Sequence, residues 1–347
     1  MSQQQRQLAR FRMPRRRGRW TALMTAQSVN QSVNQPAPLP VTAAVDLTVL
    51  GAGAWGATLA TLAERNGHRV RRWSRRFQEP LEDSLGGADI LVSAMSIKGV
   101  VELAPRLAQI GIAPSTILVS ATKGLDPATA RTPTQLWQAA LPHQAIAVLS
   151  GPNLAKEIMQ DLPAATVVSS GSVGAAQFVQ RVFASERFRV YTNTDPLGTE
   201  LGGTLKNVIA IAVGVCDGLQ LGTNAKSALI TRALAEIIRV GSYLGGETET
   251  FFGLSGLGDL LATCNSPLSR NYQVGYQLAQ GFSLSRVLAD LEGTAEGVNT
   301  ANVLFDLAQR EQIPMPIAHQ VYLLLNEQIT PQQAVETLME RDLKSED

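Results

Sequence analysis

"LTVLGAGAWG", residues 47–56, is the stretch that decides the fold. Three of its first four residues are apolar, which predicts a buried strand, and three glycines with G-x-G-x-x-G spacing follow at once. A helical pattern then covers residues 55–67, "WGATLATLAERNG", and a second strand is predicted over residues 68–73, "HRVRRW". A glycine turn that ends a strand and opens a helix inside a βαβ unit is typical of a dinucleotide-binding domain.

Each glycine of the turn has its own task. Gly51 permits the tight turn, Gly53 lets the backbone approach a pyrophosphate, and Gly56 allows the helix to pack closely on the strand. The helix begins beside Ala54, and the free N–H groups of a helix start suit phosphate oxygens. We therefore expect the residues of this turn to bind the cofactor.

The end of the second predicted strand indicates which cofactor. Dinucleotide sites that prefer NAD usually place an acid there, about 20 residues past the first glycine, to bind the ribose 2′-hydroxyl. This chain has Ser74, Arg75 and Arg76 instead, which offer donors and positive charge to a 2′-phosphate. NADP(H) is thus the expected preference, with NAD(H) as a second cofactor. Arg71 and Arg72 lie within the strand and are expected to be solvated.

Three further apolar runs predict strands of the same sheet: "ADILVSAM" (88–95), "TILVSATKG" (116–124) and "AIAVLSGP" (145–152). Short strands that alternate with helical stretches are typical of a doubly wound, mostly parallel α/β sheet. Ligands of such sheets bind at the carboxyl ends of the strands. The loops that follow these runs are therefore candidate ligand sites.

The head of the chain differs from the rest. Residues 1–44 are rich in Gln, Ser, Asn and Arg, lack apolar periodicity and end in "QPAPLP" and a few small residues, so we expect a disordered basic head. A transit peptide, or a true start at Met13 or Met24, would explain the same composition.

Charge and cysteine content narrow the function classes. The net charge is +1, and removing the seven arginines of residues 1–45 leaves −6 for the remainder, which argues against nucleic-acid binding. No apolar run reaches the length of about 18 residues that spans a bilayer, so we expect no membrane partner. The two cysteines, Cys216 and Cys264, suit buried positions in a reduced compartment, and the cytoplasm is the expected location.

Two lysines are candidates for chemistry. "ELGGTLKNVIAIAVGVCDG" (200–218) predicts a helix buried on most sides, so Lys206 and Asn207 are expected to point into a cleft. Lys123 directly follows a predicted strand and lies at the ligand-binding edge of the sheet. A buried ammonium requires a partner or a task, and two lysines at one site suggest an anionic substrate.

Polar residues nearer the C-terminus complete the candidate site. "SPLSRN" (266–271) predicts a helix start capped by Ser266 or Ser269, where free N–H groups and Arg270 suit a substrate phosphate. Asp259 is expected to orient Lys206 or to accept a substrate hydroxyl, with a structural helix cap as the alternative. The three histidines have no partner spacing, and no metal site is expected.

Seven blocks of the chain together resemble glycerol-3-phosphate dehydrogenase of the bacterial NAD(P)-dependent type. They occur in that family's order and cover about residues 46–340: "GAGAWG", "SATKGLD", "SGPNLAKE", "ELGGTLKNVIAIAVGVCDG", "GLSGLGDLLATC", "SRN" and "AEGVNT". The resemblance implies reversible reduction of dihydroxyacetone phosphate to sn-glycerol 3-phosphate for phospholipid synthesis. It also implies an NADP-binding Rossmann domain over residues 45–195 and an all-α substrate domain over residues 196–343, similar to that of 6-phosphogluconate dehydrogenase.

The resemblance further assigns roles to individual residues. Lys206 matches the family's catalytic lysine, and Lys123 matches the lysine that touches both substrate and nicotinamide. Cofactor contacts are implied for Trp55, Arg75, Arg76, Ala155, Arg270 and Glu296. Substrate contacts are implied for Gly151, Asn153, Asp259, Ser269, Arg270 and Asn271.

The chain departs from the family pattern at three places. Asn153 stands where a small hydroxyl residue is usual, and Thr294 replaces a common aliphatic residue. The segment between Arg76 and Ala88 is considerably shorter than the family's usual segment, which includes an extra helix. These departures concern the surroundings of the cofactor and substrate, while both lysines are present.

The chemistry also follows from the residues themselves. A hydride added to a ketone carbon leaves an alkoxide, and the ammonium of Lys206 can protonate it. Burial and the charge of Lys123 both lower the pKa of Lys206 toward the working pH, whereas a substrate phosphate raises it. A related β-hydroxyacid dehydrogenase or ketopantoate reductase, and a non-catalytic NADPH-binding regulator, remain as alternatives. A homodimer is the expected assembly.

Overall fold

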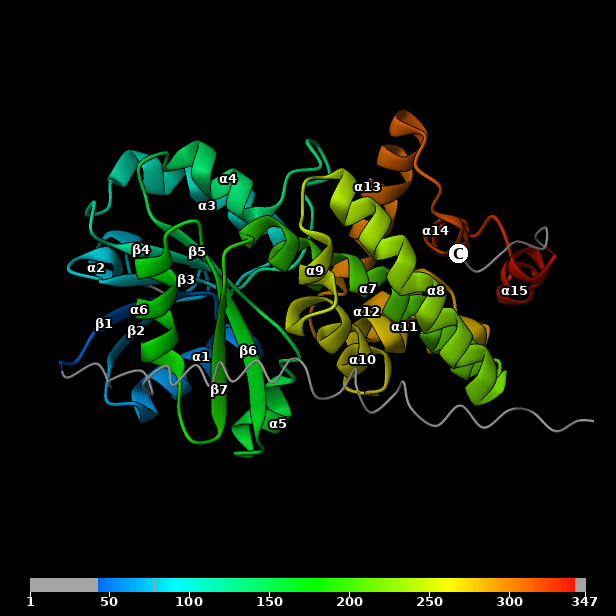
Figure 1. Ribbon diagram of the computed structural model, residues 1–347, viewed down its shortest axis with the longest axis horizontal. Coiled ribbons are helices and arrows are strands. Elements are labelled where there is room, and N and C mark those ends of the chain that lie inside the picture. The colour runs from blue at the N-terminus through cyan, green and yellow to red at the C-terminus, as the bar shows by residue number, and fades with distance from the viewer. Residues whose placement is uncertain (1–42, 78, 341–347) are drawn as a thin grey trace, which may run out of the picture. The chain divides into compact units, whose positions relative to one another are not determined.

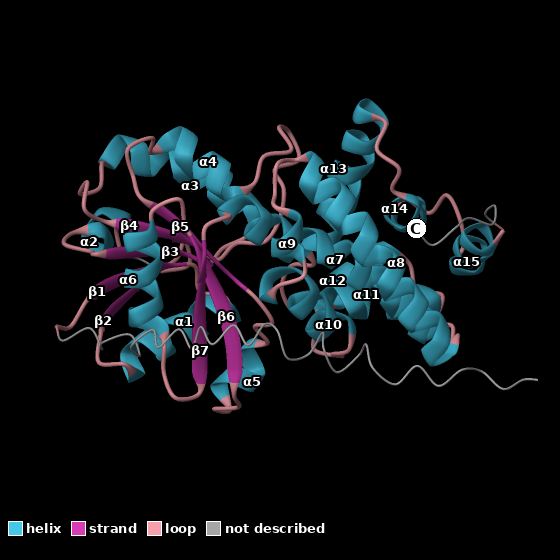
Figure 2. Ribbon diagram, viewed as in Figure 1, coloured by secondary structure: helices cyan, strands magenta, loops and turns pink. Residues whose placement is uncertain are grey.

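The computed structural model describes residues 43–77 and 79–340, all within one compact unit (Figure 1). The basic head expected over residues 1–44 lies almost wholly outside the described residues. The first half of the described chain forms a sheet flanked by helices, and the second half is helical, as Figure 2 shows. The expected fold class is confirmed.

The sheet has seven strands in the order β2-β1-β3-β4-β5-β6-β7. All neighbouring pairs are parallel except β5 and β6, which are antiparallel. The first five strands coincide with the predicted runs, and the last two were not predicted. Their bounds are β1 (Asp46–Leu50), β2 (Arg69–Trp73), β3 (Ile90–Ser93), β4 (Ile117–Ser120), β5 (Ile146–Ser150), β6 (Ala164–Ser169) and β7 (Phe188–Asn193).

Helices cover both faces of the sheet because successive strand residues point to opposite sides. In β1, Val49 packs with one group of helices and Leu50 with the other. The first group contains α1 (Ala54–Arg65), α5 (Ala155–Met159) and α6 (Val173–Phe183). The second contains α2 (Leu81–Leu85), α3 (Ile97–Ile110) and α4 (Pro133–Ala140).

β2 lies at an edge of the sheet and carries three arginines. Arg71 donates to the Gly86 carbonyl at 2.6 Å, and Arg72 pairs with Glu64 at 3.1 Å. Charged side chains on an edge strand oppose pairing with another sheet edge. Arg72 is exposed, as expected, whereas Arg71 is half-buried.

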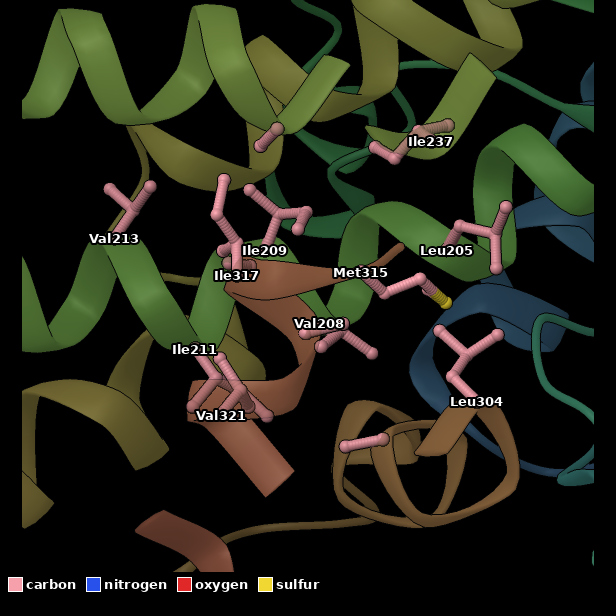
Figure 3. Close-up of a cluster of buried hydrophobic side chains, with 14 of the residues drawn as sticks. Leu205, Val208, Ile209, Ile211, Val213, Ile237, Leu304, Met315, Ile317 and Val321 are labelled. Carbon is pink, nitrogen blue, oxygen red and sulfur yellow. The ribbon is translucent and has the colours of Figure 1, made fainter. Parts of the chain in front are cut away.

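α7 (Pro196–Gly218) forms the centre of the helical half, with 19 of its 23 residues buried. It starts four residues before the predicted helix, where the Asp195 side chain accepts the N–H of Gly198 at 2.8 Å. Within the described residues, α7 alone is long and apolar enough to span a membrane by composition, and 89% of that apolar window is buried inside the protein. Its apolar side chains pack against those of the surrounding helices (Figure 3).

The remaining helices follow α7 in the chain, and most of them share its apolar core. Both cysteines of the described chain are free and buried, Cys216 at the end of α7 and Cys264 at the end of α10, as expected. The helices are α8 (Gly222–Tyr243), α9 (Thr248–Phe251), the π-helical turn η2 (Leu254–Gly258), α10 (Asp259–Cys264), α11 (Arg270–Ala279), α12 (Leu284–Asp290), α13 (Glu296–Glu311), α14 (Pro316–Leu325) and α15 (Pro331–Met339).

Candidate active site

The glycine turn between β1 and α1 has the geometry that its sequence predicts. Gly51 has φ of +128°, and a Cβ there would lie 2.3 Å from the Ala94 carbonyl oxygen. A Cβ on Gly56 would lie 2.6 Å from the Gly51 carbonyl, so the helix can approach the strand only with glycine. A Cβ on Gly53 would meet no atom within 4 Å, and Ala54 beside it is exposed. The helix start is therefore accessible, which fits a cofactor phosphate.

The end of β2 presents the residues expected to select NADP(H). Arg75 and Arg76 are both exposed, and the backbone N–H of Arg76 donates to Ser74 Oγ at 3.3 Å. The Arg75 guanidinium pairs with Glu102 of α3. An exposed ion pair contributes only about 0–1 kcal/mol, so this contact leaves Arg75 free to exchange it for a phosphate.

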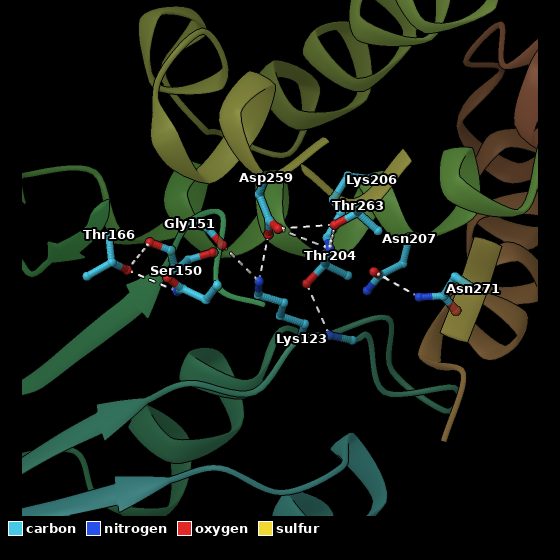
Figure 4. A network of polar contacts seen from close by, with 12 residues as sticks. Lys123, Ser150, Gly151, Thr166, Thr204, Lys206, Asn207, Asp259, Thr263 and Asn271 are labelled. Carbon is cyan, nitrogen blue, oxygen red and sulfur yellow. Dashed lines mark hydrogen bonds and ion pairs between the residues drawn. The ribbon is translucent and has the colours of Figure 1, made fainter. Parts of the chain in front are cut away.

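The two candidate lysines meet at one carboxylate, as Figure 4 shows. Lys123 Nζ lies 2.6 Å from Asp259 Oδ2, and Lys206 Nζ lies 3.1 Å from Asp259 Oδ1. Lys206 also donates to Thr263 Oγ1, which in turn donates to Asp259 Oδ1 at 3.3 Å. We call Lys123, Lys206, Asp259 and Thr263 the lysine cluster. The predicted convergence of the lysines is present.

Local structure explains the position of Asp259. The π-helical turn η2 ends directly before it, and π-helical turns are frequent at functional sites. A Cβ on Gly202 of α7 would lie 2.9 Å from the Ser255 carbonyl of η2, so glycine allows the two segments to approach. Asp259 is the first residue of α10, where the helix dipole favours a carboxylate. The N-cap of α10 is Gly258, and no side-chain hydrogen bond caps this helix. Asp259 is therefore not the helix cap that the sequence left as an alternative.

Electrostatics tune the proton affinity of Lys206. The side chains of Lys206 and Asp259 are 7% and 3% exposed, whereas that of Lys123 is 21% exposed. Burial of the ammonium lowers the pKa of Lys206 to about 8; Asp259 opposes the change and Lys123 adds to it. Burial and Lys123 act in the direction that the sequence predicts, and the counteracting charge of Asp259 was not part of that prediction. A lysine with this pKa can both donate and accept a proton near neutral pH.

The loop after β5 borders the lysine cluster. The Gly151 carbonyl accepts from Lys123 Nζ at 3.4 Å. Asn153 Nδ2 donates to Thr166 Oγ1 at 3.0 Å, and Thr166 donates to the Ser150 carbonyl at 2.8 Å. Within the described chain, Asn153 Oδ1 and Ser150 Oγ are buried and have no hydrogen-bond partner. Buried polar atoms are normally paired, so these two suit contact with a polar substrate.

The start of α11 lies next to the same region. Ser269 accepts the N–H of Tyr272 at 3.2 Å, which confirms it as the helix cap. Asn271 Nδ2 donates to Asn207 Oδ1 at 2.9 Å, and Asn271 Oδ1 accepts from the Gly297 N–H at 3.0 Å. Asn207 thus connects α7 through α11 to the start of α13.

Arg270 and Glu296 interact close to the loop that carries Lys123. Burial raises the pKa of Glu296, while the positive charge of Arg270 opposes that rise. A Cβ on Gly124 would lie 3.2 Å from Glu296 Oε2, which puts this carboxyl beside the residue after Lys123. Glu296 Oε1 is buried and has no partner within the described residues, so it suits a hydrogen-bond donor of a bound cofactor.

The structure gathers the predicted site residues into two regions. Lys123, Lys206, Asp259 and Gly151 are joined by direct contacts, whereas the glycine turn, Arg75 and Arg76 lie at the ends of β1 and β2. Ala155 begins α5, on the sheet face that α1 covers. Sequence reasoning missed Thr263, and the available signal was its position four residues after Asp259, on the same helix face.

Comparison with known proteins gives a consistent result. Residues 46–80 and 76–176 match the model of the NAD-dependent glycerol-3-phosphate dehydrogenase N-terminus, and residues 195–336 match that of its C-terminus. The chain is 66% identical to glycerol-3-phosphate dehydrogenase [NAD(P)+] of Acaryochloris marina over 300 residues, which cover 86% of this chain and 97% of that protein.

The chain belongs to the NAD-dependent glycerol-3-phosphate dehydrogenase family.

Further relatives agree with this assignment. The protein of that name from Gloeobacter violaceus is 54% identical over 301 residues, which cover 87% of this chain and 99% of the relative. The crystal structure of glycerol-3-phosphate dehydrogenase from Coxiella burnetii has a TM-score of 0.82 at 35% identity and covers 86% of this chain and 99% of its own. A ketopantoate reductase from Ralstonia eutropha shares only the fold, with a TM-score of 0.53 and 13% identity. The family assignment thus decides against the reductase alternative.

Proposed function

We propose that the lysine cluster is the catalytic centre at which this dehydrogenase reduces dihydroxyacetone phosphate to sn-glycerol 3-phosphate. The enzyme is an NAD(P)-dependent oxidoreductase of the family to which the chain belongs. The observation that carries the placement is the contact of one buried carboxylate, Asp259, with the ammonium groups of both Lys123 and Lys206. Two cations and one anion leave a net positive charge, which attracts a phosphorylated substrate.

The residues present fit a dinucleotide. The exposed start of α1 suits its pyrophosphate, Arg75 and Arg76 suit a 2′-phosphate, and the unpaired Glu296 Oε1 suits a donor group. Trp55, Ala155, Arg270 and Lys123 complete the contacts that we propose for it. When bound, the reduced nicotinamide supplies the hydride for the ketone carbon.

The substrate binds, in this proposal, between the lysine cluster and the start of α11. Ser269, Arg270 and Asn271 occupy that helix start, where backbone N–H groups and the Arg270 guanidinium suit the phosphate. Lys123 adds a second positive charge and is exposed enough to reach a ligand. Gly151 and Asn153 lie on the β5 side, where their polar groups suit the substrate hydroxyl.

Lys206 has the role of proton donor. The carbonyl oxygen gains negative charge as the C–H bond forms, and the Lys206 ammonium gives it a proton, so that the products are the alcohol and a neutral amine. Asp259 and Thr263 hold the amine in place through the contacts that they already make with it. In the reverse direction the neutral amine accepts the proton of the alcohol.

The test of this function is the loss of NADPH absorbance with purified protein and dihydroxyacetone phosphate. The expected result is rapid oxidation of NADPH and formation of sn-glycerol 3-phosphate. Glyceraldehyde 3-phosphate, an isomer with an aldehyde in place of the ketone, is the matched control and should give little turnover. Absence of turnover with the ketone would favour the non-catalytic regulator left open by the sequence.

The pH profile provides a first prediction. Because Lys206 must be protonated to act as an acid, kcat/KM for reduction should fall with rising pH, with an apparent pKa of about 8. The oxidation of sn-glycerol 3-phosphate needs the neutral amine and should rise over the same range. Initial rates in both directions between pH 6 and about 10 check the fall of the reduction rate and the rise of the oxidation rate. Two profiles that change in the same direction would contradict the assignment.

Cofactor choice provides a second prediction. Arg75→Asp combined with Arg76→Ala should lower the NADPH-to-NADH ratio of kcat/KM by about 10- to 100-fold, because hydrogen bonds to a charged phosphate contribute about 1.5–3 kcal/mol. Arg72→Ala is the matched control, since Arg72 pairs with Glu64 and should not affect the ratio. An unchanged ratio in the double variant would remove these arginines from the cofactor site.

We also propose that residues 45–195 hold the cofactor and residues 196–343 supply the proton donor and most substrate contacts. The passage from β7 to α7, between Asn193 and Pro196, supports this boundary. A homodimer in the cytoplasm that feeds glycerophospholipid synthesis, without nucleic-acid or membrane partners, completes the proposal. Light scattering of the purified protein checks the dimer.

A further inference from the structure

Glu200 is a buried carboxyl that the proposed chemistry does not use. It lies in α7, six residues before Lys206, and is 1% exposed. Its carboxylate accepts from Ser120 Oγ at 3.1 Å, from the Thr134 N–H at 3.1 Å and from Thr134 Oγ1. Ser120 is the last residue of β4 and Thr134 belongs to the first turn of α4. One side chain of the helical half therefore holds two elements of the sheet half.

A second contact lies one helical turn further along α7. Thr204, which is fully buried, accepts the Gly124 N–H at 3.1 Å through its hydroxyl (Figure 4). Residues four apart share one face of a helix, so Glu200 and Thr204 lie on the same side of α7. Glu200 contacts Ser120 and Thr134, which flank the loop of residues 121–132, and Thr204 contacts Gly124 within it. Glu200 accepts from the hydroxyl of Ser120, and Thr204 accepts from the backbone N–H of Gly124. Ser120 precedes Lys123 in the chain and Gly124 follows it.

These contacts connect the two lysines through one rigid element. Residues 121–132 form neither helix nor strand, so Lys123 has no secondary structure of its own to fix its backbone. Lys206 follows Thr204 by two residues on α7, and α7 is buried along nearly its whole length. α7 thus holds the residues at both ends of the loop through Glu200 and holds Gly124, next to Lys123, through Thr204. Thr122 and Leu125 of the loop also bond to Ser93 and Asn299, but the Thr204 contact is the one beside Lys123.

We propose that Glu200 and Thr204 are positioning residues that attach the Lys123 loop to α7 and so fix the separation of the two ammonium groups across Asp259. This inference rests on the proposed function, because it assumes that both lysines act on one substrate. The side-chain hydrogen bonds of both residues go to Ser120, Thr134 and Gly124 and not to the lysine cluster, so their effect passes through the backbone next to Lys123. A displacement of about 1 Å at a reacting group costs on the order of 10²-fold in rate.

The proposal has an electrostatic consequence that a merely structural role lacks. Lys206 is faced by Asp259 and Cys264 of α10 and by Lys123 of the loop. When the loop is released, Lys123 moves away, and the repulsion that lowers the pKa of Lys206 is lost. The falling limb of the pH profile for reduction should then move to higher pH.

Two variants test the attachments separately. Thr204→Val removes the acceptor for Gly124 with little change in shape, and Thr204→Ser keeps it. Ser120→Ala removes one donor to Glu200. The matched control is Ser170→Ala, because Ser170 is equally buried, follows the end of β6 and donates to the Ile146 carbonyl at 2.6 Å, away from the loop. Ser120→Ala changes a single small side chain and keeps the test valid if Thr204→Val does not fold.

The measurements are kcat, KM for dihydroxyacetone phosphate, KM for NADPH and the pH profile. We expect Thr204→Val and Ser120→Ala to raise the substrate KM and to lower kcat/KM by about 10- to 100-fold. The falling part of the pH profile should move to higher pH, and the NADPH KM should stay nearly unchanged. Thr204→Ser should restore wild-type values, and Ser170→Ala should lose only thermal stability.

The inference is overturned if folded Thr204→Val and Ser120→Ala retain the wild-type substrate KM and pH limb, or if Ser170→Ala reproduces their kinetic changes. These outcomes are distinct from failure of the proposed function, in which the wild-type protein itself would not oxidise NADPH with dihydroxyacetone phosphate.

Discussion

Lys206→Met is expected to lower kcat for the reduction of dihydroxyacetone phosphate by about 10²- to 10⁴-fold, the range that a positioned proton donor contributes. Methionine has nearly the length of lysine but carries no proton, so the alkoxide would have to take its proton from water. NADPH binding, followed by fluorescence titration, should remain close to wild type because the proposed cofactor contacts lie mostly in the sheet half. The loss should therefore appear in turnover.

The same variant should fold at least as well as the wild type. The folded-state pKa of Lys206, about 8, is below its ordinary value of 10.5, so the protonated side chain destabilises the folded state below about pH 8 and ceases to do so as the pH rises to 10.5. Lys206→Met removes that penalty and leaves Lys123 and Asp259 as a balanced pair. Tm at pH 7 should stay constant or rise.

The matched control for Lys206→Met is Lys156→Met, which alters an exposed lysine of α5. It should keep both kcat and Tm. Wild-type turnover by Lys206→Met would exclude Lys206 as the proton donor, whereas a drop in Tm that accounts for the lost activity would show that the residue is structural.

Asp259→Asn is expected to impair both activity and stability. The change removes the one carboxylate that both ammonium groups contact, so the lysines repel each other without an anion between them. Activity should fall by about 10²-fold or more as Lys206 loses its orientation. Breaking a buried ion pair costs about 3–5 kcal/mol, so Tm should fall clearly at pH 7.

The pH profile and a double variant isolate the cause of this loss. Asp259 is the group that raises the pKa of Lys206 against burial, so in Asp259→Asn the falling limb for reduction should move to lower pH. Adding Lys206→Met to Asp259→Asn removes the unpaired ammonium and should recover part of the lost Tm. A limb that stays in place, or additive losses of Tm, would show that Asp259 does not act through Lys206.

The parts of the fold that follow from local pattern were predictable. β1, β3, β4 and β5 are buried, apolar runs that end at turns, and their pattern identifies them without tertiary information. β7 was missed because only two of its residues, Phe188 and Val190, are buried. The exposed residues beside them, such as Arg189 and Tyr191, leave only a weak apolar pattern. β6, residues Ala164–Ser169, is a short apolar run of the same kind, and it was missed together with the short helix α5 that precedes it.

The candidate site shows the same division. Lys123 could be predicted because it directly follows a strand, at the edge of the sheet where ligands bind. Lys206 could be predicted because its apolar neighbours indicate a helix that is buried on most sides. Thr263, Glu200 and Thr204 could not, since a hydroxyl or carboxyl in a helix has no specific meaning until the rotation of that helix against its neighbours is known. Asp259 lies between these cases, because its role was predicted while its simultaneous contact with both lysines was not.

The most direct test of the central claim is reductive methylation of lysines with and without bound sn-glycerol 3-phosphate and cofactor, quantified by mass spectrometry. Formaldehyde is a small reagent, and the pKa of Lys206, about 8, provides reactive neutral amine at mildly alkaline pH. The account predicts that ligand binding protects Lys123 and Lys206 together, while the exposed Lys98 and Lys156 react at unchanged rates. Unchanged labelling of both Lys123 and Lys206 in the complex would contradict a shared substrate site.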